Sequence, residues 1–295
     1  MVRRTISDIF VERLAIIIVA VFTCLCIIPF LLIVATSFSA EEIVRVKGFS
    51  ILPQSPTLEA YKMIFQNGKV IIGSYIVTIA ITALGTVFGL AIISMTGYAL
   101  NRQDFPLRNG ISFFIYFASL FSAGLAPYYL LMVKTYHLKD NYLAILLPLM
   151  MSPWLIILMK NFVKSVPYEL TEAGKIDGAG DFTIFVRLIL PMLKPALATI
   201  GLFLALGYWN EWYQSSLFLS ARVTYKPLQY MLYQIVNQAQ YLKNSIAGAY
   251  VDFSDFPQET LKMATAVVAT GPIVLVYPFV QKYFITGITV GAVKG

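Results

Sequence analysis

A polar segment interrupts a chain that is otherwise apolar: ELTEAGKIDGAGDFTIFVRLILPMLKP, residues 169–195. Its acids, bases and glycines recur at short and regular spacing. Pro167 suits the first turn of a helix, and Gly178 suits the residue that follows its end. The pattern therefore predicts a short helix over residues 167–177.

The predicted helix carries charged residues and a set of small residues. Glu169, Glu172 and Lys175 follow one another three residues apart and cluster on one side. A helix this short is unstable by itself in water, so another surface must pack against it. The small residues that would let such a surface approach are Ala173, Gly174, Gly178, Ala179 and Gly180. An ordinary connector between membrane spans is the alternative, but connectors between packed helices usually have about 2–8 residues.

The composition explains why this segment stands out. Of the 295 residues, 58% are hydrophobic and only 13% are charged, and the mean hydropathy is +0.75. A soluble domain carries about 25% charged residues, so this chain has too little polar surface to face water and belongs to the membrane class. The net charge of +7 fits loops that face anionic headgroups. No basic run or stacking motif indicates nucleic acid.

Few residues suit metal or redox chemistry. The single histidine, His137, excludes a multi-histidine metal site. Cys24 and Cys26 are two residues apart in an apolar run, so on a helix they point about 200° apart and cannot pair with each other. We expect both cysteines to be packing residues and the histidine to lie in a loop.

Six apolar runs are long enough to cross a bilayer, which needs about 20 helical residues. They are residues 14–38, 71–100, 111–133, 142–159, 196–219 and 263–282. The first is longer than the apolar region of a signal peptide and is predicted to be a retained anchor. Pro148 and Pro153 are expected to kink the fourth run. Six spans place both termini on one side, and the distribution of Lys and Arg favours the cytoplasm.

The fifth run contains a polar pair among aromatic residues, in the order Tyr208, Trp209, Asn210, Glu211 and Trp212. An acid inside a membrane usually faces a cavity or a partner, because its insertion costs roughly 2.5–3.5 kcal/mol. Aromatic faces beside hydrogen-bonding groups suit a sugar ring. Asn210 and Glu211 are therefore candidates for a transport pathway. The aromatic residues fit either that pathway or an aromatic belt at the membrane surface.

Two further features bear on function and assembly. The sequence has no G-x-x-x-x-G-K-[ST] run to hold ATP phosphates and no plausible nucleophile–base–acid set. ATP hydrolysis, if the function needs it, must therefore be carried out by another chain. Gly85 and Gly89 form a small-residue face that permits close helix packing, either within the chain or with a partner subunit.

The segment EAGKIDGAGDFTIFVRLILP resembles the EAA loop of binding-protein-dependent ABC importer permeases. The family pattern, E-A-A, three residues, G, nine residues, I-x-L-P, falls on Glu172, Ala173, Gly174, Gly178, Leu188, Leu190 and Pro191. Gly174 replaces the second alanine of the pattern, and Leu188 replaces the isoleucine. The segments YWNEW and QKYFITGITVGAVKG resemble the carbohydrate-uptake branch, and SAGLAPYYLL is most similar to permeases of polysaccharide and alginate-type importers.

The resemblance implies an all-α membrane protein with six transmembrane helices and a cytoplasmic coupling helix between spans four and five. It implies an anchor span and first outer loop in residues 1–70 and a permease core in residues 71–295, with the coupling loop at 163–195. The residues implied to couple to the ATPase are Glu169, Glu172, Ala173, Gly174, Asp177, Gly178, Ala179 and Pro191.

The implied function is that of a permease subunit in an ATP-driven importer of an oligo- or polysaccharide, such as an alginate-like polymer. The implied partners are a homologous permease, a cytoplasmic ATPase dimer, an extracytoplasmic solute-binding protein, the saccharide and membrane lipid. ATP and Mg would be bound by the ATPase, so this chain would hold no cofactor and would not be an enzyme. The implied location is the bacterial cytoplasmic membrane, with both termini in the cytoplasm.

A secondary transporter or channel subunit without an ATPase is the alternative function. It would need a charge relay or paired broken helices near the membrane midplane. Glu211 is the one candidate for such a relay in the sequence. A membrane scaffold is a further alternative, but it would have no need of the EAA pattern.

Overall fold

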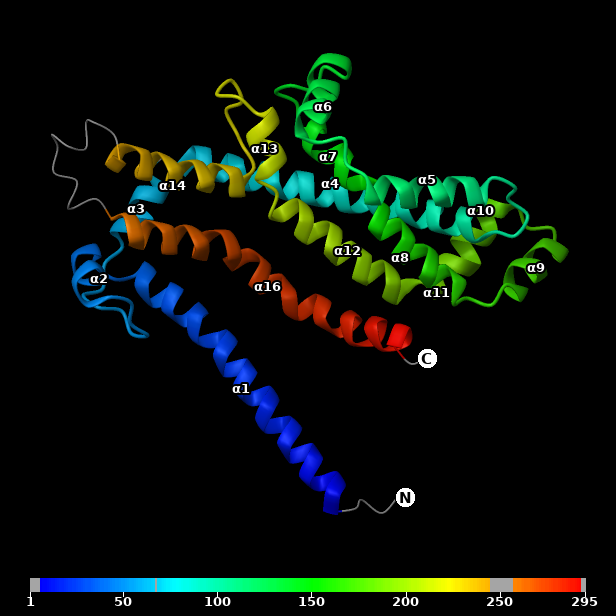
Figure 1. Ribbon diagram of the computed structural model, residues 1–295, viewed down its shortest axis with the longest axis horizontal. Coiled ribbons are helices and arrows are strands. Elements are labelled where there is room, and N and C mark those ends of the chain that lie inside the picture. Colours follow the sequence, from blue (N-terminus) through cyan, green and yellow to red (C-terminus); the bar gives the residue numbers. More distant parts are fainter. Residues whose placement is uncertain (1–5, 67, 245–256, 293–295) are drawn as a thin grey trace. The chain divides into compact units, whose positions relative to one another are not determined.

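The structure is a computed structural model that describes residues 6–66, 68–244 and 257–292. Helices dominate the described residues (Figure 1), which contain no named strand and one isolated bridge between Ser39 and Pro56. The prediction of an all-α protein is confirmed at this level.

The helices are α1 (Ile6–Ser37), α2 (Glu41–Lys47), α3 (Glu59–Phe65), α4 (Gly68–Asn101), α5 (Arg108–Leu120), α6 (Leu125–Leu130), η1 (Leu131–Thr135), α7 (Leu143–Met150), α8 (Pro153–Lys164), α9 (Glu169–Ile176), α10 (Asp181–Ile184), η2 (Phe185–Ile189), α11 (Leu190–Met192), α12 (Lys194–Trp209), α13 (Tyr213–Phe218), α14 (Leu228–Asn244) and α16 (Gln258–Ala292). The elements η1 and η2 are π-helical.

The chain forms two compact units. The first comprises Met1–Gly68 and Leu232–Pro272, and the second comprises Lys69–Met231 and Ile273–Gly295. Helices α14 and α16 each contribute to both units.

The first unit begins with the long apolar helix α1. Its apolar side chains are exposed from Phe10 to Leu31, and the helix is buried only at its end, at Ala35, Thr36 and Ser37. A helix that exposes apolar residues on all sides suits lipid rather than water. The packing role expected for Cys24 and Cys26 is not seen among the described residues, where both cysteines are free and exposed.

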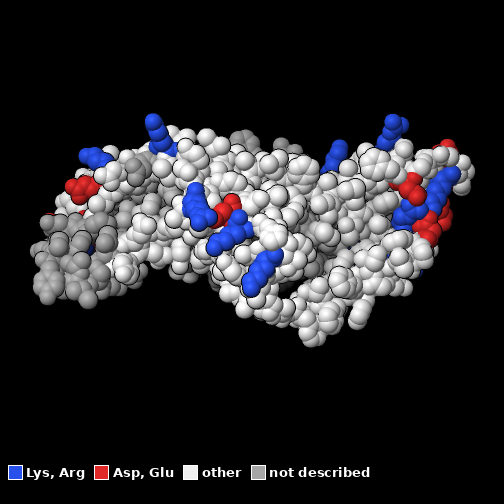
Figure 2. Space-filling view, turned by 90° about the horizontal axis from the view of Figure 1, so that it is seen from above, with Lys and Arg blue, Asp and Glu red and all other residues white. Residues whose placement is uncertain are grey.

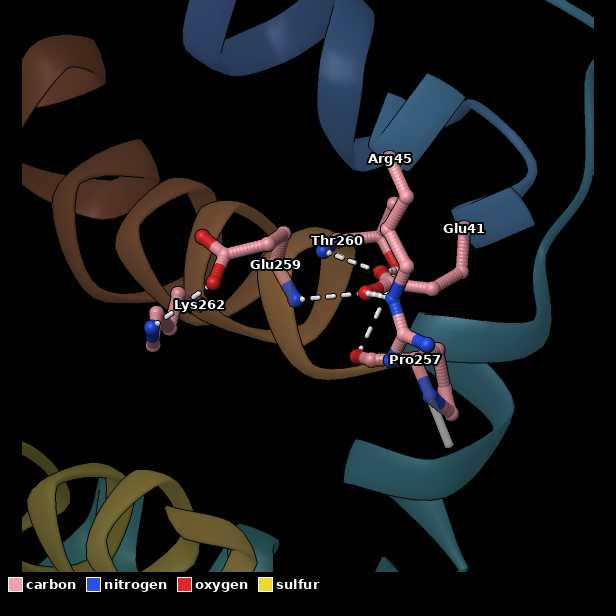
Figure 3. Close-up of polar contacts among 6 residues, drawn as sticks. All are labelled: Glu41, Arg45, Pro257, Glu259, Thr260 and Lys262. Carbon is pink, nitrogen blue, oxygen red and sulfur yellow. Dashed lines mark hydrogen bonds and ion pairs between the residues drawn. The ribbon is translucent and has the colours of Figure 1, made fainter. Parts of the chain in front are cut away.

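A buried acid joins two distant segments of the first unit (Figure 3). The carboxylate of Glu41 accepts hydrogen bonds from the backbone N–H groups of Glu259 at 3.1 Å and Thr260 at 2.9 Å, and from the Thr260 hydroxyl at 2.9 Å. Arg45, one turn later in α2, donates to the same carboxylate from 3.0 Å. Glu41 thereby satisfies donors in the first turn of α16, which have no partner inside that helix.

The second unit is built around α4, whose glycines allow other helices to approach closely. A Cβ atom at Gly85 would clash with the ring of Tyr208, and one at Gly89 would lie 3.1 Å from Leu204. At Gly97 a Cβ atom would lie 2.7 Å from the side chain of Met159. The small-residue face of α4 is therefore used for packing within the chain, which decides between the two alternatives for Gly85 and Gly89.

Three described helices are long and apolar enough to cross a membrane, and up to five if each of two bent pairs forms one span. The third predicted run is bent by 116° between α5 and the segment Leu125–Thr135. The fifth begins after a bend of 85° at residue 193, and its helix ends at Trp209 before α13 starts. Neither predicted span is one continuous helix. The first bend lies at residues 121–124, where Gly124 has a φ of +87° that favours glycine.

The fourth run counts as one candidate span, Leu143–Lys164, with a short interruption at residues 151–152. Helix α7 ends at Met150, and Pro153 occupies the first turn of α8. Pro148, by contrast, lies inside α7. The sixth run lies within α16, which is 35 residues long.

Candidate functional site

Helix α9 occupies the polar segment and ends as the sequence predicts. Gly178 has a φ of +78°, a left-handed conformation that glycine adopts without steric cost. The N–H of Gly178 donates to the carbonyl of Lys175 at 3.0 Å, and the N–H of Ala179 donates to that of Gly174 at 2.9 Å. This pair of bonds is the Schellman motif, which stops a helix at a glycine.

One side of α9 packs against the following helices. Thr171 and Gly174 are buried, and a Cβ atom at Gly174 would lie 3.0 Å from both Ile184 and Leu188. Gly174, which stands where the EAA pattern has alanine, therefore allows α9 to lie close to α10 and η2.

The opposite side of α9 is exposed. Glu169, Glu172, Ala173 and Ile176 follow one another at helical spacing, and all four are exposed. Ile176 is 85% exposed, the highest value among the large apolar residues that the structure describes. Nearby, Phe182 is 70% exposed. The surface thus combines carboxylates with apolar side chains that have no cover within the described residues.

The remaining predicted coupling residues lie around this surface. Asp177 is the C-cap residue of α9 and is exposed. Ala179 is half-buried and packs against the hydrophobic core of the second unit. Pro191 is exposed in the first turn of α11. The structure therefore brings Glu169 to Ala179 together and leaves Pro191 on a separate helix.

A cluster of four charged residues connects this segment with the end of α4. Arg102 forms a bidentate pair with Asp104, in which its Nε lies 2.8 Å from Oδ1, and its Nη1 lies 2.5 Å from Asp181. Lys175 of α9 lies 2.5 Å from the same Asp104. We name Arg102, Asp104, Lys175 and Asp181 the charge clamp. Figure 2 shows acidic and basic side chains side by side at the end of the molecule that carries α9 and α10 in Figure 1.

The clamp shifts the titration of its members. Hydrogen bonds from Arg102 and then Lys175 hold the pKa of Asp104 well below its usual range, against a smaller opposing effect of burial. The hydrogen bond to Asp104 raises the pKa of Lys175, and the same carboxyl is the largest cause of the raised pKa of Arg102. All these shifts favour the charged forms.

The sequence gives no direct signal for the clamp. Lys175 and Asp104 are 71 residues apart, and neither Arg102 nor Asp104 belongs to a recognisable motif. A basic and an acidic residue just after a predicted membrane span are ordinary in a loop, so only the fold pairs them with the polar segment.

The aromatic and polar residues predicted for a transport pathway are divided by the structure. Tyr208 is 1% exposed and its hydroxyl donates to the carbonyl of Leu146 at 2.7 Å, and Trp209 is buried. Asn210 and Trp212 are exposed, and Glu211 is half-buried. The five residues therefore do not form one continuous surface.

Glu211 has a local structural role. Its carboxylate accepts hydrogen bonds from the backbone N–H of Gln214 and from the N–H and hydroxyl of Ser215, the latter two at 3.1 and 2.7 Å. It thus caps the short helix α13 after the break that follows α12. This accounts for an acid in an apolar segment without requiring a ligand.

No group of three or more metal-binding side chains exists among the described residues. His137 lies in the loop between η1 and α7, as expected, with a φ of +54°.

Comparison with known proteins gives the family. Residues 89–290 match the family of the binding-protein-dependent transport system inner membrane component. The chain belongs to this family. It is therefore a multi-pass inner-membrane permease, a transport subunit and not an enzyme.

Characterised relatives of this permease extend over nearly its whole length. The polygalacturonan/rhamnogalacturonan transport system permease protein YtcP of Bacillus subtilis is 38% identical over 280 residues, covering 93% of this chain and 94% of that protein. The arabinooligosaccharides transport system permease protein AraQ of the same organism is 26% identical over 274 residues, covering 90% and 89%.

A solved structure is also similar. A chain of a bacterial ABC transporter involved in the import of the acidic polysaccharide alginate matches with a TM-score of 0.79 and 30% sequence identity. The match covers 96% of this permease and 100% of that chain. A secondary transporter, the alternative function, would also have bent or broken helices. None of these relatives supports that alternative.

Proposed function

We propose that this permease is one of two homologous membrane subunits of an ATP-driven importer and that α9 is the helix that contacts the ATPase. The exposed stripe of Glu169, Glu172, Ala173 and Ile176 is the observation that carries this proposal. Apolar side chains that are exposed together and rimmed by polar residues mark surfaces that are covered in an assembly. The remaining proposed contacts are Asp177, Gly178 and Ala179, which follow the stripe at the end of α9, and Pro191, which is exposed on α11.

The position of Gly174 refines the proposal. Because Gly174 faces Ile184 and Leu188, its small size serves the packing of α9 within the permease rather than contact with the ATPase. Ala173 and Ile176 then supply the apolar part of the ATPase contact.

The proposed cargo is an oligo- or polysaccharide delivered by an extracytoplasmic solute-binding protein. The names of the relatives support this class, since they refer to polygalacturonan, arabinooligosaccharides and alginate. Asn210 and Trp212 are the exposed members of the predicted pathway set, and we retain them as proposed contacts of the cargo. Glu211 would act indirectly, by holding α13 in place beside Asn210 and Trp212. Tyr208 and Trp209 would act as buried packing residues of the same segment.

The proposed topology has six spans with both termini and α9 in the cytoplasm, an anchor region in residues 1–70 and a permease core in residues 71–295. Replacing Cys24 and Cys26 by alanine removes the native thiols, after which single cysteines can be introduced at Gly180 and Asn244. An impermeant maleimide added to intact cells should label Asn244→Cys and not Gly180→Cys. Labelling of Gly180→Cys from outside contradicts the orientation.

Co-purification tests the coupling role directly. The wild-type complex should retain its ATPase and respond to the solute-binding protein with increased ATP hydrolysis. Glu172→Lys reverses a charge in the middle of the exposed stripe and should release the ATPase or abolish this stimulation. Glu42→Lys, an exposed acid in α2, is the matched control and should behave as wild type. Equal behaviour of the two variants would remove α9 from the ATPase contact.

A further inference from the structure

A groove between α5 and α8 in the second unit combines cationic, polar and aromatic side chains. It has a volume of about 430 Å³, within the range of about 300–1,000 Å³ found for small-molecule sites. Ser112, Phe113 and Tyr116 of α5 line it, together with Lys160, Asn161 and Lys164 of α8. Lys164 lies at the start of the coupling loop predicted at 163–195, but none of the six residues is among the predicted ATPase-coupling residues or the predicted pathway set.

The cationic groups of the groove have no acidic counterpart among the described residues. The ammonium of Lys160 donates to the Ser112 hydroxyl at 2.9 Å, and within those residues neither Lys160 nor Lys164 forms an ion pair. A lysine ammonium has three donors. Two of the Lys160 donors therefore remain for an anionic group, for which Asn161 adds an amide.

Helix α5 ends in a break where the backbone is not helical. Residues 121–124 are not helical and are exposed, and Gly124 has a φ of +87°. Backbone without helical hydrogen bonds is tolerated at membrane depth only inside protein or along a water-filled cavity. Among the described residues none of α5 is buried, so this helix can face such a cavity.

Two aromatic residues of the groove, Phe113 and Tyr116, offer a surface for a sugar ring. Phe113 is 68% exposed and Tyr116 is 55% exposed, so their rings offer flat apolar surfaces within reach of the lysines. A pyranose ring has an apolar face that packs on aromatic side chains. A sugar that also carries a carboxylate would be held by a charge-assisted hydrogen bond.

We propose that the groove binds the carboxylate of a uronate-containing saccharide on the cytoplasmic half of the transport route, through Lys160 and Lys164. This inference rests on the proposed function, because it assumes a saccharide cargo and the cytoplasmic orientation of the end of α8. It makes the groove a determinant of specificity for acidic over neutral saccharides. A phospholipid headgroup carries an anionic oxygen of similar chemistry, so the test must separate the two sources.

Binding is best measured without transport. In a chain with Cys24→Ala and Cys26→Ala, Ile157→Cys places a reporter thiol in the groove and leaves all six side chains intact. The probe is tetragalacturonate, and its fully methyl-esterified form is a matched uncharged sugar. At ten times the half-protecting concentration, tetragalacturonate should slow maleimide labelling about tenfold in the purified complex. The methyl ester should protect far less.

Variants that remove the lysine charges show whether Lys160 and Lys164 cause the protection. Lys160→Gln with Lys164→Gln should abolish the protection, whereas Lys62→Gln, an exposed lysine outside the groove, should leave it unchanged. Met151→Cys, an exposed site at the end of α7, reports any general slowing of the reaction. Absent protection, equal protection by the methyl ester, or protection that persists in the double variant would each overturn the proposal.

A second experiment tests whether an anionic lipid occupies the groove. The complex is placed in nanodiscs of phosphatidylcholine with or without phosphatidylglycerol, and labelling of Ile157→Cys is measured in both. If phosphatidylglycerol alone protects Ile157→Cys, the groove is a lipid site and the proposal is wrong. Stimulation of ATP hydrolysis by the solute-binding protein, measured on the same preparation, tests the proposed function separately. A complex that is stimulated but shows no protection refutes the groove only, whereas a permease that retains no ATPase refutes the importer function.

Discussion

The ammonium of Lys175 lies 2.5 Å from the carboxylate of Asp104, although the two residues are 71 positions apart in the chain. Asp104 follows the end of α4, and Lys175 lies in the last turn of α9. Arg102 makes the second connection, to Asp181 at the start of α10. The two contacts lie on either side of the turn at Gly178, so the charge clamp holds the proposed coupling segment against the end of a membrane-spanning helix.

The first prediction concerns this clamp. Asp104→Asn and Lys175→Gln should each lower uptake per ATP hydrolysed severalfold, because displacement of α9 would no longer be transmitted fully to α4. The double variant should be little worse than either single variant, since both remove the same contact. Lys262→Gln, which removes a surface ion pair with Glu259 in the first unit, should have no such effect. Additive losses in the double variant would show that the two residues act independently.

The second prediction concerns pH and salt. Because the folded pKa of Asp104 is depressed, its contribution is present above its unfolded pKa, about 3.9, and is lost as pH falls through the lower folded value. Because the folded pKa of Lys175 is raised, its contribution is present below about 10.4 and is lost as pH rises through the folded value. The clamp should therefore be insensitive to pH between about 5 and 9.

Salt should weaken the clamp where pH does not. Asp104, Lys175 and Asp181 are partly exposed, and exposed ion pairs are screened as ionic strength rises. Uptake per ATP should fall between low and high salt in the wild type and change less in Asp104→Asn. A fall of equal size in both would assign the salt effect to another contact.

The sequence predicts the positions of helices in this protein better than it predicts their continuity and their contacts. The stop of α9 at Gly178 follows from local chemistry, because one glycine with a left-handed backbone determines it. The break after Leu120 and the end of α12 at Trp209 do not, because both lie inside runs that are apolar on average and hydropathy carries no information about direction. The clamp could not be predicted at all, since its partners meet only after α4 and α9 pack.

Glu211 shows why the role of a candidate pathway residue could not be predicted from the sequence. An acid in an apolar run indicates a buried partner but does not say which one, and here the partners are the N–H groups of α13. Tyr208 similarly meets Gly85 and the carbonyl of Leu146, neither of which its own neighbourhood in the sequence suggests.

The third prediction compares two glycines of the coupling segment. Gly178→Val should be strained, because a β-branched residue at a φ of +78° costs at least about 1–2 kcal/mol. Gly180 has a φ of −68°, and a Cβ atom at this residue would meet open space, so Gly180→Val should be tolerated. We expect Gly178→Val to reduce ATPase retention or stimulated hydrolysis while the permease still inserts. Equal activity of the two variants would contradict a role for the α9 turn.

The last prediction concerns Glu41, whose side chain is 4% exposed and which accepts three hydrogen bonds from Glu259 and Thr260 of α16. Glu41→Gln keeps the size of the side chain but removes its charge and turns an N–H group toward backbone donors. Leaving such buried donors unsatisfied costs about 1–3 kcal/mol, so the variant should unfold at a lower temperature in detergent.

Glu42→Gln is the matched control for this change, because Glu42 is the adjacent acid of α2 and is exposed. It should unfold at the wild-type temperature, whereas Glu41→Gln should also become more sensitive to proteolysis around the start of α16, since that helix would lose the group that caps its first turn. Thr260→Val removes one of the same hydrogen bonds and should lower stability less than Glu41→Gln does. If Glu41→Gln and Glu42→Gln unfold together, the carboxylate of Glu41 does not fix α16 to the N-terminal part of the first unit, and apolar packing alone must hold these segments together.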